Sequence, residues 1–221
     1  MEYKITIQRI EHVNYNVVRL RTDKPKNYKF TPGQATELSI DKEHLKDEKR
    51  PFTFTSLPEE DTLEFTIKIY PSHNGVTEQL EQLKVGDTLL IGEAWGAINY
   101  KGEGTFIAGG AGITPFIAIL KHLNDNGQLG NNQLFYSNRQ EKDIIYKNNL
   151  EAWLGKHLHL ALSEENKDDY HNGHIDANYL KKHHLDVSKP VYVCGPPAME
   201  QAITADLIKL GVSDQLIIKE A

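Results

Sequence analysis

The chain has 221 residues, of which 39% are hydrophobic and 25% are charged, and its formal net charge at pH 7 is −6. This length suits one large domain or two small ones, and the composition is ordinary for a globular protein. The negative charge argues against nucleic acid as the main partner, because phosphate backbones bind clustered lysine and arginine.

Cysteine content and hydropathy exclude further classes of protein. Cys194 is the only cysteine, so the chain can form neither an internal disulfide nor an iron–sulfur cluster. No apolar run reaches the ~18 residues of a membrane-spanning helix. The N-terminus also lacks the apolar core of a signal peptide. We therefore expect a cytoplasmic protein without a membrane span.

The first hundred residues predict mainly strands. Short alternating or β-branched stretches occupy residues 4–10, 16–21, 35–40, 63–70 and 88–92, and Pro, Gly and Asp separate them. Such spacing predicts a small antiparallel barrel. One helix interrupts it over residues 78–83, where Thr77 is the expected cap and acidic residues fill the first turn.

Strands and helices alternate after residue 104. The predicted strands are residues 105–108, 133–137, 158–162, 191–194 and 216–219, and the predicted helices are residues 115–124, 143–153, 177–184 and 198–210. This order predicts a parallel sheet covered on both faces. Residues 164–173 are expected to form a polar loop. We therefore expect two domains, residues 1–101 and 102–221.

Residues 50–56 read Arg-Pro-Phe-Thr-Phe-Thr-Ser and offer what a flavin requires. Arg50 has the forked donors that suit a phosphate, and Phe52 has a flat aromatic face. Alternation along a strand places the Thr53 hydroxyl opposite Phe52, and Pro51 fixes the backbone. A barrel strand with a surface arginine and a buried phenylalanine would have the same pattern.

Residues 72–77 read Ser-His-Asn-Gly-Val-Thr and precede the helix of the barrel region. A glycine before a capped helix presents free backbone N–H groups at the positive helix end, which can bind an anion. Gly75, Val76 and Thr77 are the candidates. An ordinary capped helix explains this segment equally well.

Residues 108–115 lie between a predicted strand and a predicted helix. Gly109, Gly110 and Gly112 allow a tight turn and a close approach to a pyrophosphate at the helix N-terminus. Thr114 can cap the helix or bind the ligand, and Pro115 suits the first helical position. The spacing Gly-Gly-x-Gly-x-Thr-Pro differs from the Gly-x-Gly-x-x-Gly of dehydrogenases.

Residues 191–199 repeat the order of strand, turn and helix. Cys194, Gly195 and Pro196 begin the motif Cys-Gly-Pro-Pro-x-Met, in which consecutive prolines force an extended turn after a buried strand. Without its neighbours, the cysteine would be read as a small core residue.

In order and spacing, these segments resemble the ferredoxin-NADP reductase superfamily over about residues 3–220. The resemblance implies an N-terminal antiparallel Greek-key β-barrel that binds FAD, in preference to FMN, and a C-terminal α/β domain that binds NAD(P)H. It also implies hydride transfer from NAD(P)H to FAD. Electrons would then pass to a separate acceptor, either a redox protein such as ferredoxin or flavodoxin or a small molecule.

The resemblance also implies roles for individual residues. Arg50 would contact a flavin phosphate, Phe52 would stack on the flavin ring and Thr53 would lie near flavin N5. Cys194 would lie beside the nicotinamide, and Glu220 matches an acid near the C-terminus of relatives. The catalytic candidates are Thr53, Cys194 and Glu220. The cofactor-binding candidates are Arg50, Pro51, Phe52, Thr53, Lys68, Gly75, Val76, Thr77, Gly109, Gly110, Gly112, Thr114, Pro115, Ser137, Arg139, Cys194, Gly195 and Pro196.

Two features depart from the family pattern. Relatives often end in Glu-x-aromatic, whereas Ala221 follows Glu220 here, so the flavin face is expected to be open or covered by another residue. Ser137 and Arg139, with Lys142, favour the 2′-phosphate of NADPH. Glu164 would repel that phosphate and could bind a ribose diol. We expect a slight preference for NADPH.

Other interpretations of the sequence remain open. The histidine pairs 157/159 and 183/184 lack a third ligand of clear geometry, so no metal site is expected. A flavin reductase that releases flavin as a product is a second enzymatic function. A non-catalytic subunit of an electron-transfer complex is a third.

Overall fold

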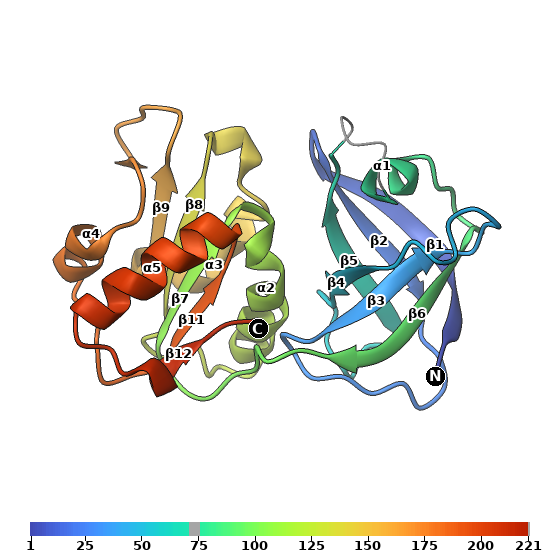
Figure 1. Cartoon of the computed structure of the whole chain (residues 1–221), viewed down its shortest axis with the longest axis horizontal. Coiled ribbons are helices and arrows are strands. Elements are labelled where there is room, and N and C mark those ends of the chain that lie inside the picture. Colours follow the sequence, from blue (N-terminus) through green and yellow to red (C-terminus); the bar gives the residue numbers. More distant parts are fainter. Residues whose placement is uncertain (71–75, 221) are drawn as a thin grey trace.

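The computed structural model describes residues 1–70 and 76–220. Figure 1 shows two lobes side by side, one for each half of the chain, and each is built on a six-stranded sheet. The predicted boundary between residues 101 and 102 falls in the segment that connects the lobes and stays a prediction. Within the described residues, no helix is long and apolar enough to cross a membrane.

The first lobe is an antiparallel barrel. Its strands are β1 (Tyr3–Asn14), β2 (Val17–Asp23), β3 (Ala35–Ile40), β4 (Arg50–Thr53), β5 (Thr62–Lys68) and β6 (Thr88–Trp95). They are ordered β4-β3-β6-β1-β2-β5, and a bridge between Phe54 and Phe65 brings the end of β4 to β5. Both rings are fully buried in the barrel core. The predicted antiparallel barrel is confirmed.

The helix of the barrel lobe, α1 (Val76–Glu81), begins one residue before Thr77. Thr77 therefore lies in the first turn and does not precede it, which corrects its predicted position as the cap. Assigned helix ends commonly differ by one or two residues. The predicted residue Gly75 lies outside the described residues.

The second lobe contains a parallel sheet. Its strands are β7 (Thr105–Gly109), β8 (Gln133–Asn138), β9 (Leu158–Leu162), β10 (His171–Asn172), β11 (Val191–Cys194) and β12 (Ile217–Ile218), in the order β10-β9-β8-β7-β11-β12. Its helices are α2 (Thr114–Asp125), α3 (Lys147–Leu154), α4 (Ala177–Lys182) and α5 (Pro197–Lys209). All its strand pairs are parallel, as predicted.

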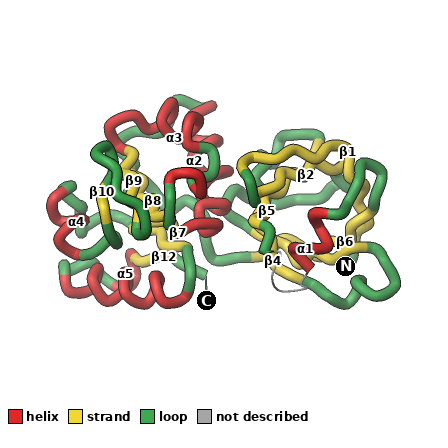
Figure 2. Tube along the Cα trace, turned by 90° about the horizontal axis from the view of Figure 1, so that it is seen from above, coloured by secondary structure: helices red, strands yellow, loops and turns green. Residues whose placement is uncertain are grey.

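Helices cover both faces of this sheet, as Figure 2 shows from above. Phe106 and Tyr136 face the cluster formed with α2 and α3, whereas their neighbours Ile107 and Phe135 face the cluster formed with α4 and α5. Alternate strand residues thus enter opposite cores, which is why the strands are apolar on both sides.

Two elements differ from the expected ones. The helix expected from residue 143 begins at Lys147, because Glu141–Asp143 form a 3₁₀ turn capped by Gln140 and because Tyr146 is left-handed at φ 56°. The loop expected over residues 164–173 contains the short strand β10, which pairs with β9.

The strand order fixes where a ligand can bind. The chain runs from β7 outward through β8 and β9 and then returns to place β11 on the other side of β7. Ligands of open α/β sheets bind at such a reversal, beyond the carboxyl ends of the strands. The glycine-rich motif follows β7 and the Cys-Gly-Pro-Pro motif follows β11, so both motifs lie where the strand order reverses.

Candidate active site

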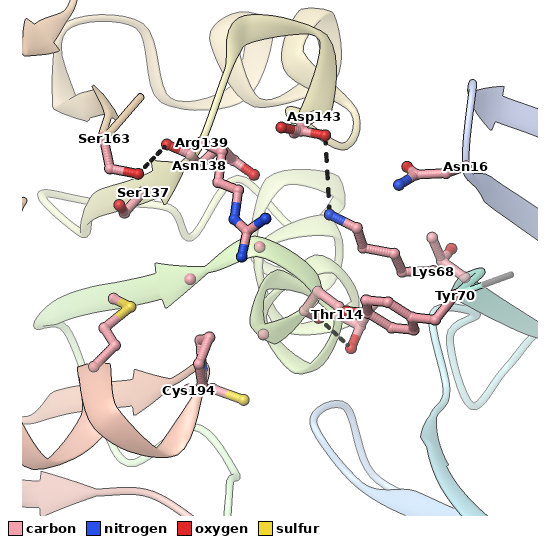
Figure 3. Close-up of a pocket in the computed structure, with 18 of the residues that line it drawn as sticks. Asn16, Lys68, Tyr70, Thr114, Ser137, Asn138, Arg139, Asp143, Ser163 and Cys194 are labelled. Carbon is pink, nitrogen blue, oxygen red and sulfur yellow. Dashed lines mark hydrogen bonds and ion pairs between the residues drawn. The ribbon is translucent and has the colours of Figure 1, made fainter. Parts of the chain in front are cut away.

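A cleft of about 1340 Å³ lies between the lobes, where β4 and β5 of the barrel face the carboxyl ends of β7, β8 and β11 (Figure 3). Typical small-molecule pockets have about 300–1,000 Å³. The cleft is therefore large enough for more than one ligand.

The barrel contributes predicted flavin-binding residues to one wall of the cleft. Pro51, Phe52 and Thr53 of β4 line it, and Lys68 lines it from the end of β5. Phe52 is half-buried and packs against the barrel core. Its side chain therefore lies between the barrel core and the cleft.

Arg50 is the predicted flavin-binding residue that points elsewhere. It is exposed, and its guanidinium donates hydrogen bonds to the Lys49 carbonyl at 2.7 Å and to Glu48 Oε2 at 3.1 Å. Among the described residues, Arg50 is not part of the cleft wall. Exposed ion pairs of this kind contribute about 0–1 kcal/mol, so the pair with Glu48 is a weak constraint on the side chain.

The opposite wall is formed by the glycine-rich turn after β7 and the Cys-Gly-Pro-Pro turn after β11, which pack against each other. A Cβ on Gly112 would lie 2.3 Å from the Cys194 carbonyl oxygen, and a Cβ on Gly109 would lie 2.3 Å from Met199 Sδ. Gly110 differs, because a Cβ there would meet no atom within 4 Å. Gly109 and Gly112 are thus required by packing, whereas Gly110, at φ 52°, is required by its backbone conformation.

The start of α2 differs from its predicted form. Ile113 is the cap residue, Thr114 is the first residue of the helix and Pro115 is the second. The cause is the 3₁₀ turn Gly110–Ile113, which carries the helical backbone into α2. The Thr114 hydroxyl donates to the Ala111 carbonyl at 3.0 Å and lines the cleft, whereas Pro115 is buried.

Cys194 lines the cleft at the end of β11, next to Gly195 and Pro196. Burial, together with the carboxylates of Glu200 and Glu220, raises the pKa of its thiol to about 12. The group is therefore a protonated thiol near neutral pH. A protonated thiol is a poor nucleophile but can pack and donate a weak hydrogen bond.

Glu220, the third catalytic candidate, lies beside the segment that connects the lobes. Its Oε2 accepts a hydrogen bond from the Ala97 N–H and its Oε1 one from the Ile98 N–H, both at 3.2 Å. Figure 1 shows the C-terminal end of the chain between the lobes. Within the described part of the chain, Thr53 and Cys194 share the cleft and Glu220 is not in its wall.

The predicted NADPH-binding residues lie at the end of β8 (Ser137) and just after it (Arg139 and Lys142). Ser137 and Arg139 line the cleft, and so does Glu164, whose opposing charge the sequence had suggested. Arg139 Nε lies 3.4 Å from Glu164 Oε1, and both side chains are more than half exposed. The expected attraction and repulsion of a 2′-phosphate thus come from adjacent groups.

Several residues that sequence reasoning missed also line the cleft. Tyr15 is in the turn between β1 and β2, Tyr70 follows β5, and Asp143 is in the 3₁₀ turn after β8. None belongs to a recognisable motif. Their presence depends on how the lobes meet, which no local pattern encodes.

Two of the histidines belong to an aromatic cluster outside the cleft. His159 of β9 and His183 after α4 lie 4.2 Å apart between ring centroids, and Phe135 and Tyr179 pack on them. Over residues 1–70 and 76–220, no three His, Cys, Asp or Glu side chains are arranged to hold a metal ion.

Comparison with known families matches both lobes. The family model of an FAD-binding domain matches residues 2–93, and that of an oxidoreductase NAD-binding domain matches residues 106–205. The two matched ranges each supply one wall of the cleft.

Individual relatives agree with these matches. The chain is 23% identical, over 99% of its length, to the ferredoxin–NAD(P)+ reductase component of the naphthalene 1,2-dioxygenase system of Pseudomonas putida, and it covers 68% of that protein. It is 29% identical, over 91% of its length, to the reductase component of propane 2-monooxygenase from Rhodococcus jostii, of which it covers 58%. The chain thus spans between about half and two thirds of these relatives.

Among solved structures, the cytochrome b5 reductase domain of Ulva prolifera nitrate reductase superposes with a TM-score of 0.86 at 22% identity. The superposition covers 99% of this chain and 97% of that one. At this identity the likeness establishes the fold.

Proposed function

Since this chain belongs to the ferredoxin-NADP reductase superfamily, we propose that it transfers hydride from NAD(P)H to bound FAD and passes the electrons to a separate acceptor. The acceptor is a redox protein such as ferredoxin or flavodoxin, or a small molecule. One observation carries the proposal: Thr53 of the barrel and Cys194 of the α/β lobe line the same cleft.

The residues of the cleft fit both groups. A flavin ring requires a flat apolar surface, which Phe52 provides, and its phosphates require donors and cations, which Thr77 and Lys68 provide from the same wall. The nucleotide requires a turn with room for its pyrophosphate. Gly110 supplies that room, because a Cβ there meets no atom within 4 Å.

The bound flavin supplies the two-electron chemistry, and the chain supplies binding and orientation. In this proposal Phe52 packs on the flavin ring and the Thr53 hydroxyl donates a hydrogen bond near N5. Cys194 keeps its proton and packs beside the nicotinamide. Arg50, with Gly75 and Val76, completes the phosphate contacts when its exposed side chain turns from Glu48.

An absorbance spectrum of the purified protein tests the proposal directly. We expect a yellow protein whose flavin band bleaches on addition of NADPH, and Arg50→Ala should retain less flavin because a charge-assisted contact contributes about 1.5–3 kcal/mol. A colourless protein that takes up no added FAD would refute it. Loss of the flavin on gel filtration would favour a flavin reductase, and bound flavin without reduction would favour a non-catalytic subunit.

We further propose that NADPH is preferred over NADH by a small factor. Arg139, with Ser137 and Lys142 nearby, would attract the 2′-phosphate, but Glu164 Oε1 lies 3.4 Å from Arg139 Nε and competes for the guanidinium. Both side chains are largely exposed, so solvent weakens both effects.

Paired variants test this preference. Arg139→Ala should raise KM for NADPH and leave NADH nearly unchanged. Glu164→Gln should lower KM for NADPH, because the repulsion is removed while the side chain keeps its size. Equal effects of Arg139→Ala on both nucleotides would show that Arg139 is only a surface residue.

A further inference from the structure

Two residues outside the predicted motifs join the lobes at the cleft. Tyr15 lies in the turn between β1 and β2 and is 60% exposed. Its hydroxyl donates a hydrogen bond of 2.5 Å to Oδ1 of Asp143, which belongs to the 3₁₀ turn of the other lobe. Both residues line the cleft. The contact therefore crosses between the lobes at the site itself.

Each end of this contact is fixed within its own lobe. On the barrel, the Asn16 carbonyl accepts a hydrogen bond from the Ile69 N–H at 2.7 Å, which ties the turn to the end of β5. On the α/β lobe, Asp143 Oδ2 accepts from the Gln140 N–H at 3.2 Å. A hydrogen bond between two anchored groups restrains the position of one lobe against the other, as does the contact of Thr66 with Tyr146.

Charge strengthens the contact from the barrel side. Asp143 is only 6% exposed, so its carboxylate requires compensation. The Lys68 side chain extends from the barrel toward Asp143 (Figure 3). Its Nζ lies 3.9 Å from Asp143 Oδ1. Lys142 Nζ lies 5.1 Å from the centroid of the Tyr15 ring. The buried carboxylate thus depends on the opposite lobe for two of its partners.

We propose that Tyr15 and Asp143 form a latch that holds the lobes at the spacing needed to align the nucleotide with the flavin. They are positioning residues, and the inference rests on the proposed function. Alignment is sensitive to small shifts, because a misplacement of about 1 Å can cost 10²-fold in rate. The turn that carries Asp143 begins two residues after Arg139, so the latch also fixes one side of the nucleotide wall.

Tyr15→Phe tests the latch, because it removes only the hydroxyl. Tyr3→Phe is the matched control: it removes a hydroxyl that bonds to Glu93 at 3.1 Å on an exposed part of the barrel. At saturating nucleotide, flavin reduction in Tyr15→Phe should be about tenfold slower than in the native protein or in Tyr3→Phe. Flavin content should be equal in all three. Asp143→Asn keeps an acceptor for the Gln140 N–H but removes the charge that faces Lys68. Its rate of flavin reduction should lie between the rates of the native protein and of Tyr15→Phe.

A second measurement does not depend on activity. Backbone amides of residues 139–146 should exchange with deuterium faster in Tyr15→Phe than in Tyr3→Phe, with or without flavin. If the native protein binds no flavin or is not reduced, the proposed function fails and the exchange result alone decides whether the latch exists. If the native protein is reduced and Tyr15→Phe matches Tyr3→Phe in rate, the positioning role is overturned, whatever the exchange shows.

Discussion

At the scale of single residues, the structure shows where the predicted site residues lie, and their roles stay predictions. Gly112 was expected to give a pyrophosphate room, whereas in the structure it is required because a Cβ there would lie 2.3 Å from the Cys194 carbonyl oxygen. The orientation of Arg50 was not predictable, because its guanidinium bonds to the adjacent Lys49 carbonyl and Glu48 and not to a cleft group. The place of Glu220 was not predictable either, because it depends on backbone groups far away along the chain. Glu220 binds backbone N–H groups of residues 97 and 98, which carry no sequence signal.

Cys194→Ser tests the local chemistry of the cleft. Because burial keeps the pKa of the thiol at about 12, we expect no thiolate reactivity, and alkylation by iodoacetamide at pH 8 should be slow. The serine variant should keep the flavin spectrum, because Cys194 lies on the nucleotide wall. Loss of a contact of about 1 kcal/mol would slow flavin reduction roughly fivefold.

Thr53→Ala is the companion variant on the flavin wall and should slow the same step. Both variants should retain the native melting temperature within about 2 °C. Unchanged reduction rates in both variants would show that the family roles of these residues do not apply to this chain.

At the scale of elements, the strands were the most predictable part, because each presents a short apolar or alternating run. Strand β10 was missed, because only two residues pair and their sequence, His-Asn, has no strand character. The start of α3 was misjudged for another reason. Asp143 looked like a helix start, but its carboxylate caps a separate 3₁₀ turn and bonds to Tyr15 of the other lobe.

The histidine cluster between β9 and α4 predicts a pH dependence. Burial, together with the nearby His183 and His157, lowers the pKa of His159 to about 4. The folded state thus favours the neutral ring, whereas the unfolded chain takes up a proton near pH 6.5. The contribution of the neutral His159 ring to the free energy of unfolding is fully present above pH 6.5, and it is lost as the pH falls toward 4. We expect the free energy of unfolding to decrease by about 1–2 kcal/mol over this range, after allowance for solvent screening.

His159→Phe isolates this effect, because phenylalanine keeps the packing on Phe135 without a titrating group. Its free energy of unfolding should vary less between pH 7 and pH 4 than that of the native protein. The same substitution at the exposed His44 should leave the native pH profile in place. Parallel pH profiles for all three proteins would assign the acid sensitivity to other groups.

At the scale of the whole molecule, the two lobes and their order were predictable, but their contacts were not. The predicted elements change from mainly strands to alternating strands and helices after residue 104, and the glycine motif indicates a nucleotide-binding sheet. The interface consists of pairs that are distant in sequence, such as Thr66 with Tyr146, whose hydroxyls lie 3.0 Å apart. Such pairs form only when the two lobes have packed together, so a single sequence does not predict which residues meet across the interface.

The segment that connects the lobes begins next to a natural fluorescent probe, because Trp95 is the last residue of β6. This indole is 42% exposed at the end of β6, two residues before Ala97, whose N–H binds Glu220. Its emission should therefore report how the lobes pivot. The chain has one other tryptophan, Trp153 on α3, so a Trp153→Phe protein contains a single tryptophan, whose indole can be excited selectively over the tyrosines. We expect NADP+ to shift its emission maximum, and we expect Glu220→Ala to produce part of that shift without nucleotide, so the protein can be titrated with no added dye.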